Sequence, residues 1–245
     1  MLWANRVPAI PLFGGLTEEE KQEYLGEGKV KKISPREYLF RHGDPAGHFY
    51  IICYGTIKLF RQIPDGHEIT TDILIAGNTI GEIEILESFP LYQSNAQAIE
   101  PVSVLQFPKQ WLKDTAKKNG KFALNLLSSV AQTARLSEIE AEQQATMSAP
   151  QLIGCFLQRL CVLHDFNPKG FELPYSKTLI ASRLGMELET FSRALAKLKD
   201  HGINVDGMNV VFDDFAKMKD YVCGHCSVTH DCPTHQSIQR KFAKK

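Results

Sequence analysis

Residues 176–202 read SKTLIASRLGMELETFSRALAKLKDHG and contain two short helix patterns separated by a glycine. Ser176 can cap the first helix, because a serine side chain accepts a hydrogen bond from an amide group of the first helical turn. Gly185 breaks the pattern, and Gly202 ends the second helix. Two short helices around a glycine turn are typical of a helix-turn-helix. The stretch NVDGMNVVF, residues 204–212, then predicts a two-strand wing with a glycine-containing hairpin turn.

The segment before this motif predicts a long helix. Residues 109–146 contain no proline and only one glycine. Their apolar side chains recur at helical spacing, at Phe122, Leu126, Leu127, Val130, Ala131, Ala134 and Leu136. A long helix whose apolar stripe has no domain of its own to cover it usually packs against a second copy, so the pattern predicts a two-fold homodimer. Ser148 and Pro150 mark the start of the next helix, which we expect to run to Leu163.

The N-terminal part of the chain has a strand pattern. Short apolar runs such as HFYIICYG, residues 48–55, and TIKLFRQI, residues 56–63, are broken by glycine and proline turns. Many short strands at regular spacing predict a jelly-roll barrel. The expected fold class is therefore α+β. We divide the chain into a barrel over residues 1–108, a dimerisation helix over 109–148, a winged helix-turn-helix over 149–220 and a cysteine-rich tail over 221–245.

Composition narrows the class of protein. No apolar run approaches the roughly 18 residues that span a bilayer. The N-terminus lacks the pattern of a secretory signal, so we expect a reducing, cytoplasmic location in which the six cysteines are thiols or metal ligands. The net charge is zero, so nucleic-acid binding has to be argued from particular side chains. Because the chain contains neither a Walker loop nor an H-E-x-x-H motif, nor an evident nucleophile–base constellation, we do not expect an enzyme.

The order of barrel, long helix, helix-turn-helix and wing resembles the CRP/FNR family over residues 12–220. The stretch GMELETFSRALAKL, residues 185–198, is similar to the family's pattern G-x-[ST]-x-E-T-x-[SG]-R. The glycines of the strand region fall where cyclic-nucleotide-binding-type barrels place theirs, at Gly43, Gly55, Gly66 and Gly81. The resemblance implies a homodimeric transcription regulator with such a barrel, which binds double-stranded DNA and acts on RNA polymerase.

The recognition helix carries the candidate DNA contacts. Glu189, Ser192 and Arg193 are spaced i, i+3 and i+4, so all three project from one helix face and can enter a major groove together. Arginine bonds guanine O6 and N7, and glutamate accepts from cytosine N4. The similarity to the FNR branch implies a palindrome with TTGAT-like half-sites. The candidate DNA-binding residues are Glu189, Thr190, Ser192, Arg193 and Ser176. Glu187 stands where the family usually has a serine or threonine cap.

The barrel lacks one group that cyclic AMP requires. Gly81 and Glu82 are present, but the downstream LYQSNAQA, residues 91–98, has Gln93 where cyclic-AMP-binding members have arginine. A neutral glutamine cannot replace a guanidinium against a buried phosphate, so we do not expect cyclic AMP to bind in the usual way. The resemblance instead implies a structural role or haem. The candidate iron ligands for haem are His42, His48 and His67.

The tail contains a second candidate site. Cys223, Cys226 and Cys232 follow the spacing C-x2-C-x5-C, in which a pair of thiolates and a third one after a loop fit a cubane cluster. The resemblance implies an oxygen- or nitric-oxide-labile [4Fe-4S] cluster. The possible fourth ligands are Cys155, Glu138, Glu140 and Glu142. Zinc is the main alternative metal, because histidines that allow a Cys3His site are interleaved at His225, His230 and His235. A plain redox dithiol at Cys223 and Cys226 is a third alternative.

Overall fold

The computed structural model describes residues 10–163, 167, 169–213, 221–224 and 232. The chain divides into two compact units, Met1–Ala134 and Arg135–Lys245. None of the helices in the described ranges has an apolar stretch that could span a bilayer.

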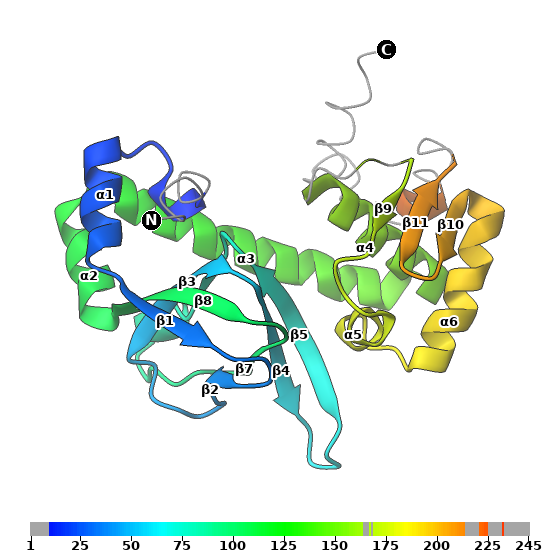
Figure 1. The fold of residues 1–245 in the computed structure, drawn as a ribbon, viewed down its shortest axis with the longest axis horizontal. Coiled ribbons are helices and arrows are strands. Elements are labelled where there is room, and N and C mark those ends of the chain that lie inside the picture. Colours follow the sequence, from blue (N-terminus) through cyan, green and yellow to red (C-terminus); the bar gives the residue numbers. More distant parts are fainter. Residues whose placement is uncertain (1–9, 164–166, 168, 214–220, 225–231, 233–245) are drawn as a thin grey trace. The chain divides into compact units, whose positions relative to one another are not determined.

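The first unit is a barrel of two four-stranded antiparallel sheets (Figure 1). One sheet has the strand order β1-β8-β3-β6 and the other β2-β7-β4-β5. The strands are β1 (Lys29–Ile33), β2 (Tyr38–Phe40), β3 (His48–Tyr54), β4 (Thr56–Gln62), β5 (Glu68–Ile75), β6 (Thr79–Ile80), β7 (Asn95–Ala98) and β8 (Val102–Pro108). Two short 3-10 helices, η2 (Pro11–Phe13) and η3 (Glu84–Leu86), accompany them. The expected jelly-roll-type barrel is confirmed.

Aromatic rings join helix α1 to the helices that follow the barrel. Helix α1 (Glu18–Gly26) begins with a capping box in which Thr17 and Glu20 satisfy each other's backbone amides. Its Tyr24 ring lies 5.8 Å from Trp111, edge to face, and 5.9 Å from Phe122. These contacts join α1 to the two helices that follow the barrel, and burying such large rings stabilises the unit.

The segment after the barrel forms two helices, α2 (Lys109–Lys118) and α3 (Gly120–Thr146). Asn119 breaks the helix with φ −123° and ψ 103°. Its Oδ1 accepts hydrogen bonds from the amides of Lys121 and Phe122, at 3.0 and 3.1 Å. An asparagine side chain that caps the next helix competes with continued helix formation. The single helix expected over residues 109–148 is therefore corrected to two, and the long helix begins at Gly120.

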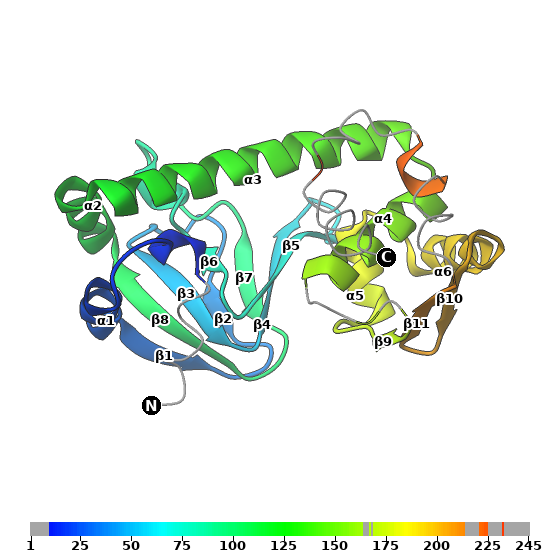
Figure 2. The same ribbon diagram turned by 90° about the horizontal axis from the view of Figure 1, so that it is seen from above.

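The second unit contains helix α4 (Ala149–Leu163). It begins beside Ser148 and Pro150 and ends at Leu163, as predicted from the sequence. Helices α5 (Lys177–Arg183) and α6 (Leu188–Lys197) follow, and the 3-10 helix η4 (Leu198–His201) continues α6. A three-stranded antiparallel sheet completes the unit (Figure 2). Its strands are β9 (Phe171–Glu172), β10 (Ile203–Asp206) and β11 (Asn209–Phe212).

Candidate nucleic-acid interface and cysteine segment

Helices α5 and α6 form the predicted helix-turn-helix. The Ser176 hydroxyl caps α5 by accepting a hydrogen bond from the Leu179 amide at 3.2 Å. The turn passes through Gly185 with φ 66°, in the left-handed region that glycine adopts without strain. Gly202 follows η4 with φ 80°. The cap and turn residues predicted from the sequence, Ser176, Gly185 and Gly202, therefore have the expected local structures.

Helix α6 has one buried and one exposed face. Phe191 and Ala194 are buried in the second unit. Glu189, Thr190, Ser192 and Arg193 are exposed. Because the buried pair fixes the rotation of the helix, the predicted contact residues are all left on the solvent side.

The exposed side chains of α6 interact weakly with one another. Arg193 Nη2 lies 3.5 Å from Glu189 Oε1, and these side chains are 69 and 79 % exposed. Such a surface ion pair contributes little to stability, so both groups are free to turn toward a DNA base. The Ser192 hydroxyl donates to the Leu188 carbonyl at 2.8 Å, which leaves its oxygen lone pairs as acceptors.

The N-terminus of α6 differs from the family's usual cap. Glu187 has the extended backbone of a cap, with φ −63° and ψ 144°, but its side chain makes no cap hydrogen bond. The amide groups of the first turn are therefore available to a phosphate oxygen, which helix N-termini bind well.

The wing is the hairpin of β10 and β11. The two strands pair from Ile203 with Phe212 to Asp206 with Asn209, and Gly207 turns the hairpin with φ 57°. The two-strand wing is confirmed. Its third strand, β9, pairs with β11 and was not predicted, because two residues are too short for a periodicity signal.

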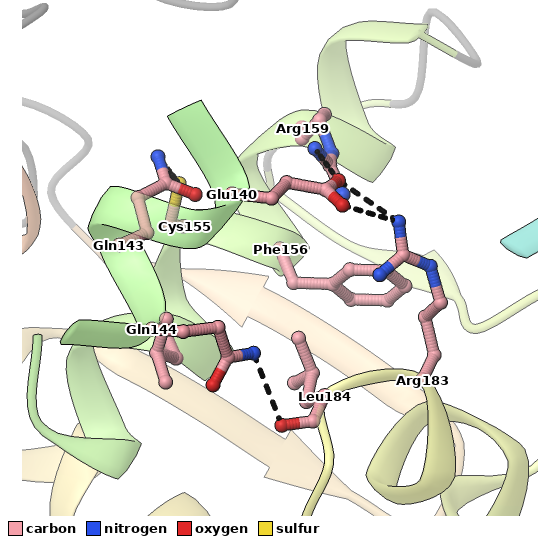
Figure 3. A pocket seen from close by; sticks show the side chains of 9 residues that line it. Glu140, Gln143, Gln144, Cys155, Phe156, Arg159, Arg183 and Leu184 are labelled. Carbon is pink, nitrogen blue, oxygen red and sulfur yellow. Dashed lines mark hydrogen bonds and ion pairs between the residues drawn. The ribbon is translucent and has the colours of Figure 1, made fainter. Parts of the chain in front are cut away.

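Glu140 of α3 joins three helices through its carboxylate (Figure 3). Its oxygens accept from Arg159 of α4 at 2.8 Å and from Arg183 of α5 at 2.8 and 2.9 Å. Burial raises the pKa of Glu140, but the charges of the two arginines outweigh burial and hold that pKa below its usual range. This carboxylate is already engaged, which weighs against Glu140 as a metal ligand.

Cys155 lines a small cavity beside this ion network. The cavity has a volume of about 20 Å³, which is room for one water molecule. Its wall includes Gln143, whose Nε2 donates to Cys155 Sγ at 3.5 Å (Figure 3). Among the described residues no three His, Cys, Asp or Glu side chains are grouped as a metal site.

The described part of the cysteine segment packs on the second unit. Cys223 and Cys232 are half-buried, and Tyr221 and Val222 contact α4 and its neighbours. Cys226 and the candidate zinc ligands His225, His230 and His235 lie outside the described residues.

Comparisons with known proteins agree with this architecture. The family model "Cyclic nucleotide-binding domain" matches residues 30–119, and "Crp-like helix-turn-helix domain" matches residues 153–221. The Electron transport regulator A of Shewanella oneidensis is 30% identical over 214 residues, which cover 84% of this chain and 82% of that protein. The chain belongs to the CRP/FNR family of transcription regulators. The Fumarate and nitrate reduction regulatory protein of Vibrio cholerae is 27% identical over 85% of this chain and 84% of its own.

A solved structure shows the same CRP/FNR fold. FixK2 from Bradyrhizobium japonicum superposes with a TM-score of 0.69 and 22% identity, over 79% of this chain and 96% of that one. The α+β fold class predicted from the sequence, a barrel followed by a long helix and a winged helix-turn-helix, is therefore confirmed.

Buried aromatic side chains and one buried carboxyl lie in the barrel of this CRP/FNR protein. The Tyr92 ring stacks on Phe40 with centroids 3.6 Å apart, and its hydroxyl donates to the His48 carbonyl at 2.5 Å. Glu82 is buried, accepts from the Thr79 hydroxyl, and has one carboxylate oxygen with no hydrogen-bond partner in the described structure. Burial raises its pKa.

The candidate haem ligands lie in different environments. His42 and His67 are exposed, whereas His48 on β3 is half-buried. Burial lowers the pKa of His48, and Lys31 and Lys29 lower it further. No contact in the described structure brings these three side chains together.

Sequence reasoning missed several residues that join elements. Arg61 of β4 donates from Nε to the Gln93 carbonyl at 2.7 Å, so a guanidinium does reach the loop where the downstream arginine is missing. No local sequence pattern predicts a contact between residues as far apart in the chain as Arg61 and Gln93. Gln151 did have a signal, because Ser148 and Gln151 form the S-x-x-Q pattern of a capping box.

Proposed function

We propose that this CRP/FNR regulator is a homodimer that binds a palindrome with TTGAT-like half-sites through Glu189, Ser192 and Arg193. The observation that carries the proposal is the exposed face of α6, which bears all three side chains while the opposite face is buried. Arginine and glutamate on one face match a guanine and a cytosine edge in a major groove. Thr190 and Ser176, both exposed, are suited to phosphate contacts beside them. The bound dimer recruits or blocks RNA polymerase.

The surface of α3 supports the dimer. The stripe predicted from the sequence is corrected at Phe122 and Leu126, because both are buried in the barrel core. On the other side of the helix Leu124 and Leu127 are 63 and 65 % exposed. Leu124, Leu127, Ala131 and Ala134 are spaced three, four and three residues apart and are all exposed. This is the spacing of a two-stranded helical seam, with small residues that allow close approach. A second copy of α3 covers this stripe and pairs the two recognition helices, as a palindrome requires.

The sensing group we propose is a [4Fe-4S] cluster on Cys223, Cys226 and Cys232. The donor set fits, because cysteine thiolates are the usual ligands of such clusters and the two described thiols are half-buried. When bound, the cluster supplies iron that reacts with oxygen or nitric oxide. Cys155 is the possible fourth ligand, and Glu138 and Glu142 are alternatives.

One anaerobic preparation serves to test both the proposed cluster and the proposed DNA recognition. The chain is purified without oxygen, and iron, sulfide and zinc are measured on the sample whose absorption spectrum is recorded. About four iron and four sulfide per chain, with a visible band that bleaches in air, are expected. One zinc and no colour would overturn the cluster and make the tail a zinc site.

Matched cysteine variants locate the cluster. Cys223→Ser is expected to lose iron. Cys53→Ser is expected to keep it, because burial raises the pKa of the Cys53 thiol to about 11 and thus disfavours a thiolate there. Equal loss of iron in both variants would contradict the assignment.

The unsubstituted protein from the same preparation is then tested by gel retardation on a duplex with two TTGAT half-sites and on a scrambled duplex. Equal retardation of the two duplexes would refute the proposed recognition of the half-site sequence.

A further inference from the structure

The Gln151 side chain uses both ends to join two parts of the second unit. Its Oε1 accepts from the Ser148 amide at 2.9 Å and from the Ser148 hydroxyl at 2.8 Å. Its Nε2 donates to the Tyr221 carbonyl at 3.1 Å. Ser148 lies in the junction between α3 and α4, and Tyr221 begins the segment that carries Cys223. Gln151 is 7 % exposed, so water cannot easily replace either partner.

The same segment packs against α4. Val222 is fully buried and faces Gly154 of α4, where an added Cβ would come within 2.7 Å of Val222 Cγ2. Leu198 of η4 and Ile203 of β10 lie around the same position, at 3.6 and 3.5 Å. Only a glycine in α4 leaves room for this contact.

A ring contact strengthens the link. The Tyr221 ring stacks on His201, with centroids 3.4 Å apart and planes 11° apart. His201 is the last residue of η4, which directly continues α6. Tyr221 therefore contacts Gln151 of α4 through its backbone carbonyl, and His201 of η4 through its ring.

We propose that Gln151 is a positioning residue that couples the segment Tyr221–Cys223 to the α3–α4 junction. This inference rests on the proposed function, in which a chemical change at Cys223 controls DNA binding. A change that displaces Tyr221 leaves the Gln151 amide buried without its acceptor, so the side chain turns and the Ser148 cap loosens. The junction that leads into the helix-turn-helix then changes with the state of the cysteine segment.

A double-mutant cycle tests this coupling without any cofactor. Gly154→Ala displaces Val222, whereas alanine in a helix is otherwise favourable, so a loss of DNA affinity reports the displaced segment. Gln151→Glu keeps an acceptor for Ser148 but replaces the donor to Tyr221 with an oxygen. Gln144→Glu is the control for the added charge, because Gln144 is an exposed glutamine whose Nε2 also donates to a carbonyl, that of Leu184 at 3.3 Å, and in the described structure it forms no hydrogen bond to Ser148 or Tyr221. All variants are full-length and stripped of metal.

The effects of Gly154→Ala and Gln151→Glu on DNA affinity are expected not to be additive. Gly154→Ala lowers affinity for the TTGAT duplex by about ten-fold in the native and Gln144→Glu backgrounds, and clearly less after Gln151→Glu. Equal factors in all three backgrounds would overturn the coupling. If Gly154→Ala does not fold, Val222→Ala takes its place in the cycle.

Hydrogen exchange separates this inference from the proposed function. The Ser148 amide should exchange faster in Gly154→Ala than in the native chain, and this difference should vanish in the Gln151→Glu background. An unchanged Ser148 amide would overturn the coupling even when DNA binding and the cluster are both established. Loss of the coupling cannot be confused with a wrong half-site or a missing cluster, because this measurement uses neither DNA nor metal.

Discussion

The barrel and the second unit treat buried polar groups differently. In the barrel Glu82 is enclosed with one oxygen unpartnered in the described structure, and burial alone dominates its pKa, which is raised. In the second unit Glu140 is half-buried, but two arginines from different helices reach it and its pKa is lowered. The barrel holds its carboxyl by packing, whereas the second unit uses a carboxylate to tie α3, α4 and α5 together.

This difference indicates where a signal can travel. A closely packed aromatic interior, such as the stack of Tyr92 on Phe40, resists displacement of any one ring. Polar links such as Glu140 and Gln151 connect elements at single points, so a change at one end alters the hydrogen bonds at the other. We therefore expect substitutions in the barrel to act on stability and those in the second unit to act on DNA binding as well.

The largest effect is expected for Tyr92→Ala. Removing a buried ring costs about 3–5 kcal/mol, whereas Tyr92→Phe keeps the ring and removes the hydroxyl, which donates to the His48 carbonyl and also forms a hydrogen bond with Tyr50. The measurement is urea unfolding followed by the fluorescence of Trp111, which packs in the barrel core, in a Trp3→Phe background. A cost for Tyr92→Ala no larger than that for Tyr92→Phe would show that the barrel interior is not closely packed.

Arg193→Ala tests whether a substitution in the second unit can weaken DNA binding without changing stability. Loss of one bidentate base contact weakens specific binding by about 1–3 kcal/mol. The melting temperature should not change, since Arg193 is exposed and pairs only weakly with Glu189. Lys32→Ala, on an exposed position of β1, removes the same charge and is the control. Equal losses in both variants, measured by fluorescence anisotropy, would mean that Arg193 contributes only charge.

Glu140→Gln tests the ion network. Loss of the charged hydrogen bonds to Arg159 and Arg183 should cost about 2 kcal/mol in a calorimetric unfolding experiment. Because the folded pKa is lowered, the contribution of Glu140 is complete above its unfolded pKa near 4.5 and is lost as the pH falls through the folded value. Glu189→Gln, at an exposed carboxylate, is the control. If both variants lose little stability, the network does not hold the helices.

The smallest expected effect is on the slope of stability against pH, to which Glu82 contributes. Because the folded pKa of Glu82 is raised, the folded state keeps its proton while the unfolded chain has lost it. Stability should therefore fall as the pH rises from about 4.5 toward the folded pKa, opposite in sign to Glu140. Glu82→Gln should remove this decline, measured as melting temperature between pH 4 and pH 8. An unchanged slope in the variant would mean that Glu82 is hydrated in the barrel.

Much of the architecture follows from local patterns. Ser176, Gly185 and Gly202 have the cap and turn conformations expected of them, because these conformations depend on the residue and its immediate neighbours. The break at Asn119 was missed because an asparagine inside a helical pattern is compatible with continuation until its side chain caps the next turn. The tail could be predicted only as a spacing of cysteines, and most of it lies outside the described residues.

The sequence by itself determined the class of protein, the order of its domains and the face of α6 that carries Glu189, Ser192 and Arg193. These properties are set by periodicity and by the conformational preferences of single residues, which act over a few positions. Only the tertiary structure decided that Glu140 meets Arg159 and Arg183, that Arg61 reaches Gln93, and that Gln151 joins Ser148 to Tyr221. Such contacts bring together residues far apart in the chain, and they depend on how whole helices and strands pack rather than on any local pattern.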